Sequence, residues 1–106
     1  MAKIKKRKVR WSSTYNPEVA GYKLYWTSNG EGVDYESDSY EVGNVSEIIL
    51  PDHVTSFPLI SGDVELGITA VSRSGNESDM TKFTASFDFT VPDAPTDLAV
   101  EEDMYS

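Results

Sequence analysis

The sequence predicts an all-β protein, an antiparallel sandwich of two sheets, from two observations. No segment of the 106 residues repeats apolar side chains at three- and four-residue spacing for more than one turn, as an amphipathic helix requires. Apolar and polar residues alternate instead in short runs, most regularly at Phe83, Ala85, Phe87 and Phe89. Successive strand side chains point to opposite faces, so each run offers one face to a core and one to water. Six or more short strands without a helix favour a sandwich.

The first two strands are expected at residues 4–11 and 21–27. Their apolar residues lie two apart and therefore share one face of each strand. These residues are Val9, Trp11, Tyr22, Leu24 and Trp26. Tyr25 belongs to the opposite, polar face of the second strand, so we expect its ring to be exposed.

Four further strands are expected along the rest of the chain. They lie within residues 35–42 and at 46–50, 64–73 and 82–89. Turn residues such as Gly43-Asn44 and Ser74-Gly75-Asn76 separate them. Residues 51–60 contain Pro58 inside an apolar patch, and proline lacks the backbone donor of a central strand. We therefore expect a loop there.

Composition narrows the class of protein. The chain has the length of one domain, and it contains no cysteine for a disulfide or a thiolate metal site. It has no apolar run long enough for a membrane helix, so no membrane association is expected. The basic start lacks the apolar stretch of a secretory signal. The chain as given is expected to be cytoplasmic, or extracellular if it is a domain excised from an exported protein.

Charge is distributed unevenly along the chain. Residues 1–10 carry six basic side chains and no acidic one, whereas the remaining residues carry three basic and all 18 acidic side chains. Segments of opposite charge attract each other, so neighbouring molecules are expected to align head to tail at low salt. The basic segment resembles a nucleic-acid-binding patch, but the acidic remainder would repel a polyanion. We do not expect a nucleic-acid partner.

Several segments together resemble the fibronectin type III module, particularly its bacterial members. They are Trp11, GYKLYW at 21–26, VGNVSEIIL at 42–50, VELGITAVSRSGNES at 64–78 and PDAPTDLAV at 92–100. The resemblance covers residues 4–90 and implies strands B to G of that sandwich. It also implies a non-catalytic role in adhesion, spacing or partner binding. Val64 stands where the family has a tyrosine, so the anchor which that hydroxyl supplies is missing.

The signature of the family's first strand, strand A, lies at residues 92–100 instead of before residues 4–11. We therefore divide the chain into a domain at 1–91 and a tail at 92–106. Residues 90–92 reach at most about 10 Å, which is too short to return the tail to the opposite pole. Three interpretations stay open: the start of a next module, exchange into another molecule, or a parallel or edge addition on the same molecule.

Exchange makes the tail a self-association element. In this hypothesis the tail pairs with residues 4–11 of another copy, with its apolar side chains facing inward and its acidic side chains opposite basic ones. The residues expected to take part are Lys6, Lys8, Arg10, Asp97, Leu98 and Val100. The result would be a dimer if exchange is reciprocal, or a head-to-tail chain.

Catalytic and ligand motifs are sparse. His53 is the only histidine and lies in the expected loop, and no nucleophile, phosphate or zinc motif occurs. Asp34, Glu36 and Asp38 are hard oxygen ligands, but they lack the glycine and glutamate spacing of an EF-hand. We therefore predict no enzyme activity, no cofactor and no metal.

Surface aromatics leave one competing class open. Tyrosines could line a groove for sugars or peptides, because aromatic rings stack on both. The candidates are Tyr15, Tyr25, Tyr35 and Tyr40, of which Tyr25 is the expected ligand-facing residue. The competing class is a carbohydrate-binding accessory domain of a secreted hydrolase.

Overall fold

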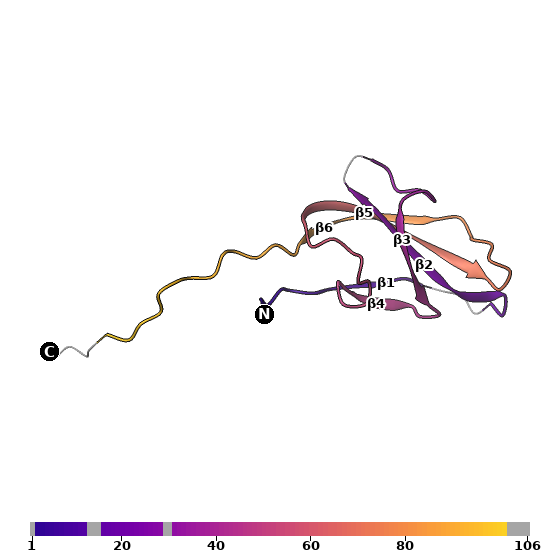
Figure 1. The fold of residues 1–106 in the computed structure, drawn as a ribbon. Helices are drawn as coiled ribbons and strands as arrows, with labels where there is room; N and C mark the ends of the chain where they lie inside the picture. Colours follow the sequence, from indigo (N-terminus) through magenta and orange to yellow (C-terminus); the bar gives the residue numbers. More distant parts are fainter. Residues whose placement is uncertain (1, 13–15, 29–30, 102–106) are drawn as a thin grey trace.

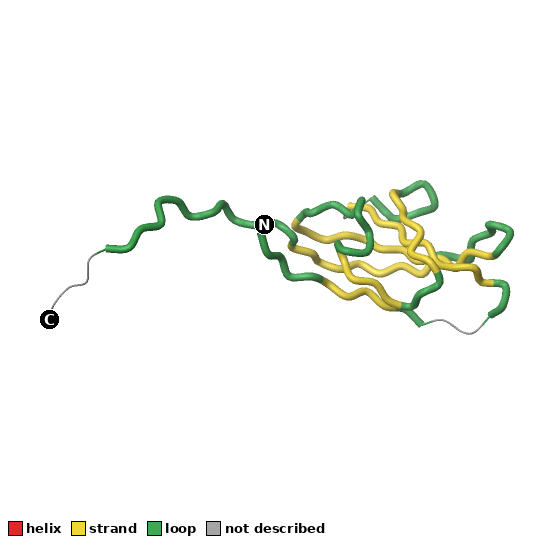
Figure 2. Tube along the Cα trace, turned by 60° about the horizontal axis from the view of Figure 1, so that its bottom comes forward, coloured by secondary structure: helices red, strands yellow, loops and turns green. Residues whose placement is uncertain are grey.

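The computed structural model describes residues 2–12, 16–28 and 31–101, and these residues contain two antiparallel sheets and no helix (Figures 1 and 2). One sheet pairs β1 with β4, and the other has the order β3-β2-β5-β6. The strands are β1 Arg7–Arg10, β2 Val19–Ser28, β3 Asp38–Gly43, β4 Glu47–Leu50, β5 Ser61–Ser72 and β6 Thr81–Asp88. The predicted all-β, two-sheet sandwich is confirmed, with its six strands within a few residues of the expected ranges.

The core lies between the two sheets. It is built from the inward positions of each alternating run, because those side chains lose contact with water when the sheets pack face to face. Trp26 on β2 lies opposite Leu66 on β5, which shows how the register brings inward residues together. The buried core residues are Leu24, Trp26, Ile48, Leu50, Val54, Phe57, Val64, Leu66, Phe87 and Phe89.

The segment between β4 and β5 is a loop, as expected from Pro58, but it also completes the core. Val54 is fully buried, and the ring of Phe57 lies 5.3 Å from that of Trp26 and 5.5 Å from that of Phe87 (centroid distances). The loop therefore closes one end of the sandwich with an aromatic cluster. Apolar residues without a two-residue period gave no sequence signal for this role.

Residues 90–101 continue beyond β6 as an extended segment without regular secondary structure. Every one of them is exposed, and the segment leads away from the sandwich at the end where β1 begins (Figures 1 and 2). Asp97 has φ 58°, in the left-handed region that aspartate tolerates better than most residues. Leu98 and Val100 are 100% and 98% exposed, so neither side chain packs against any other residue that the structure describes.

Candidate functional site

The most distinctive surface is a slot between β1 and β6, which we call the edge slot. Among the described residues, β1 pairs only with β4, and β6 is the outer strand of its sheet. The two strands border connected hollows whose lining includes Val9, Leu66, Phe83, Ala85 and Phe87. The floor of the slot is apolar, and basic residues of β1 (Arg7, Lys8 and Arg10) line its side. The slot lies between two open sheet edges, so it has the form of a missing strand.

The uncovered core face is clearest along β6. Phe83, Ala85, Phe87 and Phe89 alternate on one face of the strand. Phe87 and Phe89 are buried, Ala85 is half-buried, and Phe83 is 70% exposed. The exposed fraction of these side chains rises from Phe89 to Phe83, because the opposing two-stranded sheet does not cover the Phe83 end of β6. Phe83 is thus a core-facing residue without a cover.

Backbone groups on the open side of β1 belong to Lys8 and Arg10. The Trp11 N–H donates to the Ser46 carbonyl at 3.0 Å, and Val9 lies opposite Ile48 in the same register. In an antiparallel ladder, alternate residues direct both backbone groups to one neighbour. Val9 and Trp11 therefore bond to β4, and the alternate residues, Lys8 and Arg10, direct their N–H and C=O toward the edge slot. An added strand could form hydrogen bonds with these groups.

Two further polar groups mark the slot. The Arg7 guanidinium crosses to β6, where it donates to the Ser86 carbonyl at 2.6 Å and lies 5.2 Å from the centre of the Phe87 ring. Trp11 lines the other end of the slot, and its indole Nε1 is buried without a hydrogen-bond partner among the described residues. A buried donor without a partner costs free energy, so an occupant that offers an acceptor there would be stabilised.

The predicted self-association residues divide into two separate sets in the isolated chain. Lys8 and Arg10 are on β1 beside the slot, while Asp97, Leu98 and Val100 lie on the exposed segment beyond β6. Lys6 precedes β1, and its Nζ forms an ion pair with Asp52 Oδ2 at 2.6 Å. The structure does not bring the two sets together within one molecule. The sequence analysis did not identify Phe83 as a slot residue. The alternation of residues 82–89 did place Phe83 on the inward face of its strand.

The prediction that Tyr25 is exposed and faces a ligand is wrong. Tyr25 is 1% exposed, because Tyr35 from the loop before β3 and Glu77 from the loop before β6 lie against it. Its ring lies 5.9 Å from Tyr35, whose hydroxyl donates to the Ser78 carbonyl at 2.8 Å. Tyr40 packs against the core, and Tyr15 lies outside the described residues. Tyr25 and Tyr35 therefore hold loops, and the three described tyrosines of this set have structural contacts.

The Tyr25 hydroxyl is tied to the loop between β5 and β6. It donates to Glu77 Oε1, which also accepts from Thr69 Oγ1 at 2.8 Å. Burial, together with the hydrogen bond and charge of Glu77, raises the pKa of Tyr25 above its usual value. The bond from Tyr25 is the largest cause that lowers the pKa of Glu77, with Thr69 and Lys23 adding to it, and partial burial opposes them.

We expect this pair to make stability depend on pH at the acid end. A carboxyl whose folded pKa is depressed contributes stability above its unfolded pKa, and that contribution is lost as pH falls through the folded pKa. Glu77→Gln should therefore lose less of its unfolding free energy than the unmodified chain between pH 7 and pH values below the ordinary glutamate pKa. Urea denaturation at both pH values measures this difference.

Asp79→Asn is the matched control, because it removes one negative charge from the same loop without touching Tyr25. It should lose as much stability on acidification as the unmodified chain. Equal acid losses in Glu77→Gln and the unmodified chain would show that the Tyr25 bond does not hold the Glu77 carboxylate in its charged form.

The other candidate side chains have structural partners. Asp34 Oδ1 accepts from the Glu36 N–H at 2.8 Å in the turn before β3. The His53 Nδ1 accepts from the Ile49 N–H at 2.8 Å, which fixes the turn after β4. Within residues 2–12, 16–28 and 31–101, no group of three His, Cys, Asp or Glu side chains is placed to hold a metal ion.

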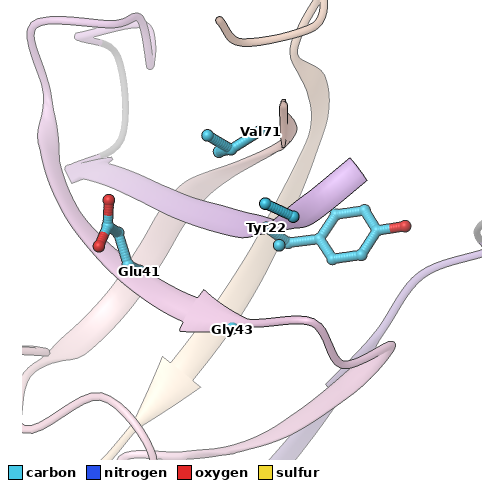
Figure 3. Close-up of a pocket in the computed structure, with 6 residues that line it drawn as sticks. Tyr22, Glu41, Gly43 and Val71 are labelled. Atoms are coloured by element: carbon cyan, nitrogen blue, oxygen red, sulfur yellow. The ribbon is translucent and has the colours of Figure 1, made fainter. Parts of the chain in front are cut away.

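A separate hollow lies where β2 meets β3 and β5 (Figure 3). Figure 3 shows the Tyr22 ring pointing away from Glu41 and Val71. Gly21 and Gly43 line the hollow and approach closely, so that a Cβ on Gly21 would lie 3.2 Å from the carbonyl carbon of Gly43. Glu41 is the one ionisable carboxylate that lines it, and a lone carboxylate provides no acid–base pair.

Comparison with known protein families, with characterised proteins and with solved structures found no match. Over the part of the chain that the structure describes, no helix is long and apolar enough to cross a membrane. The edge slot and the exposed segment are therefore the surfaces on which a functional proposal rests.

Proposed function

We propose that this chain is a fibronectin type III-like, non-catalytic interaction module, which self-associates by inserting residues 96–101 of one copy into the edge slot of another. The supporting observation is that the chain exposes two apolar surfaces of complementary form, which do not contact each other in the single molecule. The inward-facing Phe83 is exposed beside the open edge of β1, and Leu98 and Val100 are exposed two residues apart on an extended segment. Adding a strand to an open edge is an established mode of peptide recognition.

The energetics favour a concentration-dependent assembly. Burying a leucine, valine or phenylalanine side chain contributes roughly 1.5–3 kcal/mol, and each net backbone hydrogen bond contributes about 0.5–1.5 kcal/mol. Association opposes these gains by about 4–15 kcal/mol of lost freedom, with ordering of the segment in addition. The gains and the costs are of similar size, so the assembly is expected to depend on protein concentration.

The segment does not reach the antiparallel position in its own slot. Thr96 lies seven residues after Phe89, so its Cα is at most about 25 Å from that of Phe89. The end of the slot at Trp11 lies beside Thr81, at the opposite end of β6 from Phe89. That distance is about 26 Å at ~3.3 Å per residue, before any residue is used to reverse the chain. When residues 96–101 occupy the slot in this direction, they therefore come from a second copy.

Charge supports the same occupant. Asp97 and Glu101 alternate with Leu98 and Val100, so they point outward when the apolar pair points inward. The outward side chains of β1 are Lys8 and Arg10, both exposed. Opposite charges across paired strands contribute roughly 0.2–1 kcal/mol per pair. They also steer the approach of the acidic segment toward the basic strand.

Removing the segment tests the proposal directly. Light scattering should report oligomers for the full chain at high concentration and low salt, and monomers for a chain that ends at Thr90. The shortened chain should keep its fold, because residues 91–101 are exposed and form no strand. Raising the salt concentration should weaken the assembly, since exposed ion pairs are screened.

A monomeric full chain at high concentration and low salt contradicts the proposal. An equal oligomeric state for the full and shortened chains also contradicts it, because the contact would then lie elsewhere. Circular dichroism of both chains confirms that the comparison is between folded proteins.

A further inference from the structure

The geometry points to one direction and one register for the inserted segment, an inference that rests on the proposed function. We infer that the segment runs antiparallel to β1 with Asp97 opposite Arg10 and Glu101 opposite Lys6. Copies then join as an open head-to-tail chain and not as a closed dimer.

The backbone of β1 sets the positions that must pair. Lys8 and Arg10 direct their N–H and C=O into the slot, so the residues opposite them need both backbone groups. In the inferred register these are Ala99 and Asp97, each of which has an N–H. Pro95, which has none, falls opposite Ser12, beyond the end of β1. A shift of two residues in one direction would place Pro95 opposite Arg10 and remove a hydrogen bond.

Side-chain chemistry selects the antiparallel direction. Along β1 and the residues before it, the basic Lys5 and Lys6 come first and the apolar Val9 and Trp11 come later. The tail has the reverse order, since Leu98 and Val100 precede Glu101 and the acidic residues that follow in the sequence. The antiparallel register places Leu98 opposite Val9 and Glu101 opposite Lys6, and it places Val100 opposite Arg7, whose guanidinium lies over the Phe87 ring. A parallel arrangement would carry the acidic end toward Trp11.

The inward positions of this register match the slot. Leu98 lies opposite Val9, over the hollow lined by Leu66 and Phe83. Thr96 lies opposite Trp11, where its hydroxyl oxygen is an acceptor for the buried indole N–H that lacks a partner in the isolated chain. Asp97 must change from its left-handed conformation to an extended one, so insertion straightens the segment at this residue.

Direction decides whether the assembly closes. The segment leaves its own molecule at the end where β1 begins, whereas an antiparallel strand enters the slot at the Trp11 end, which is the opposite pole (Figure 1). Each copy therefore donates at one pole and accepts at the other, which is a heterologous contact that propagates. Reciprocal exchange would require the second segment to span both sandwiches, and residues 90–95 reach only about 20 Å.

Cysteine cross-linking tests direction and closure together, because the chain has no native cysteine. Opposite residues in a hydrogen-bonded antiparallel pair have Cα atoms about 5.5 Å apart, within the range of a disulfide. The full chain carrying Arg10→Cys and Asp97→Cys should form a ladder of dimers, trimers and higher species on a non-reducing gel after mild oxidation. Reduction should return all of it to monomer.

The matched control carries Arg10→Cys with Glu101→Cys. In the inferred register Glu101 lies four residues beyond Asp97, about 13 Å away at ~3.3 Å per residue, so this variant should cross-link poorly. A parallel segment centred on Lys8 would instead place Glu101 opposite Arg10 and bring like poles together, which predicts strong dimers in this control and no ladder.

The outcomes separate this inference from the proposed function. If the unmodified chain is monomeric by light scattering, the proposed function fails. If the unmodified chain assembles but Arg10→Cys with Asp97→Cys stops at dimer or forms no cross-link, then the direction or register is wrong while self-association stands. A cross-linked monomer without free thiols would show insertion into the same molecule and overturn the inference.

Discussion

Two different monomeric variants of this chain are expected to form a heterodimer when they are mixed. The first carries Leu98→Asp and Val100→Asp, which damage the donated segment and leave the slot intact. The second carries Phe83→Asp, which damages the slot and leaves the segment intact. Only one productive contact is then possible, between the segment of the second variant and the slot of the first. Light scattering should report monomers for each variant alone and a dimer for the equimolar mixture.

The expected effect is large because the substitutions remove apolar burial at the contact itself. Burying a leucine or valine side chain contributes roughly 1.5–3 kcal/mol, so loss of both weakens association by about a hundredfold to ten-thousandfold. The isolated fold should tolerate the changes, since Leu98 and Val100 are fully exposed and Phe83 is largely exposed. Loss of assembly would therefore report on the contact and not on unfolding.

Val45→Asp is the matched control for these variants. Val45 is an exposed apolar residue between β3 and β4, and it does not line the edge slot. Its substitution should leave the assembly unchanged. The proposed contact between residues 96–101 and the edge slot is contradicted if the mixture of the slot variant and the segment variant stays monomeric. It is also contradicted if Val45→Asp disrupts assembly as much as these variants do.

The largest stability loss is expected for Phe57→Ala. The Phe57 ring is buried against Trp26, Phe87 and Phe89, so its removal leaves a cavity at the closed end of the sandwich. Substitutions of this kind cost about 3–5 kcal/mol, a large part of the ~5–15 kcal/mol that stabilises a domain of this size. Urea denaturation should show a much lower midpoint, or an unfolded chain without denaturant.

Phe83→Ala is the control of identical chemistry, because it removes the same side chain from an exposed position. It should change the unfolding free energy of the monomer by no more than about 0.5 kcal/mol. Measurement at low protein concentration and high salt keeps assembly out of the comparison. Equal losses for the two substitutions would show that the loop with Phe57 is not a structural part of the core.

The six strands were predictable because each carries its own local signal. Alternation at a two-residue period states which side chains can face a core, and turn residues such as Gly43 and Gly75 interrupt the runs. Both glycines have positive φ in the structure, as their turns require. The predicted ranges therefore differ from the observed strands by only a few residues, which is the usual uncertainty of strand ends.

Burial of individual side chains was less predictable, because it depends on what folds over each face. Tyr25 occupies a polar-face position of β2, yet loops cover it, and the Met80 side chain lies over Gly67, where it would have to shift to admit a Cβ. Phe57 lies in a segment without periodicity and still belongs to the core. Alternation assigns a residue to one face of a strand, but loops distant in sequence decide whether that face is exposed to solvent.

The same distinction applies to the proposed contact. The sequence alone determined the all-β architecture, the basic start, and the strand-A-like pattern of residues 92–100, because these follow from local pattern and charge. Only the tertiary structure decided that β1 has an open edge beside β6, that Phe83 lies uncovered there, and that the segment departs from the opposite end of the slot. These are relations between elements distant in sequence, and they arise only when the two sheets pack.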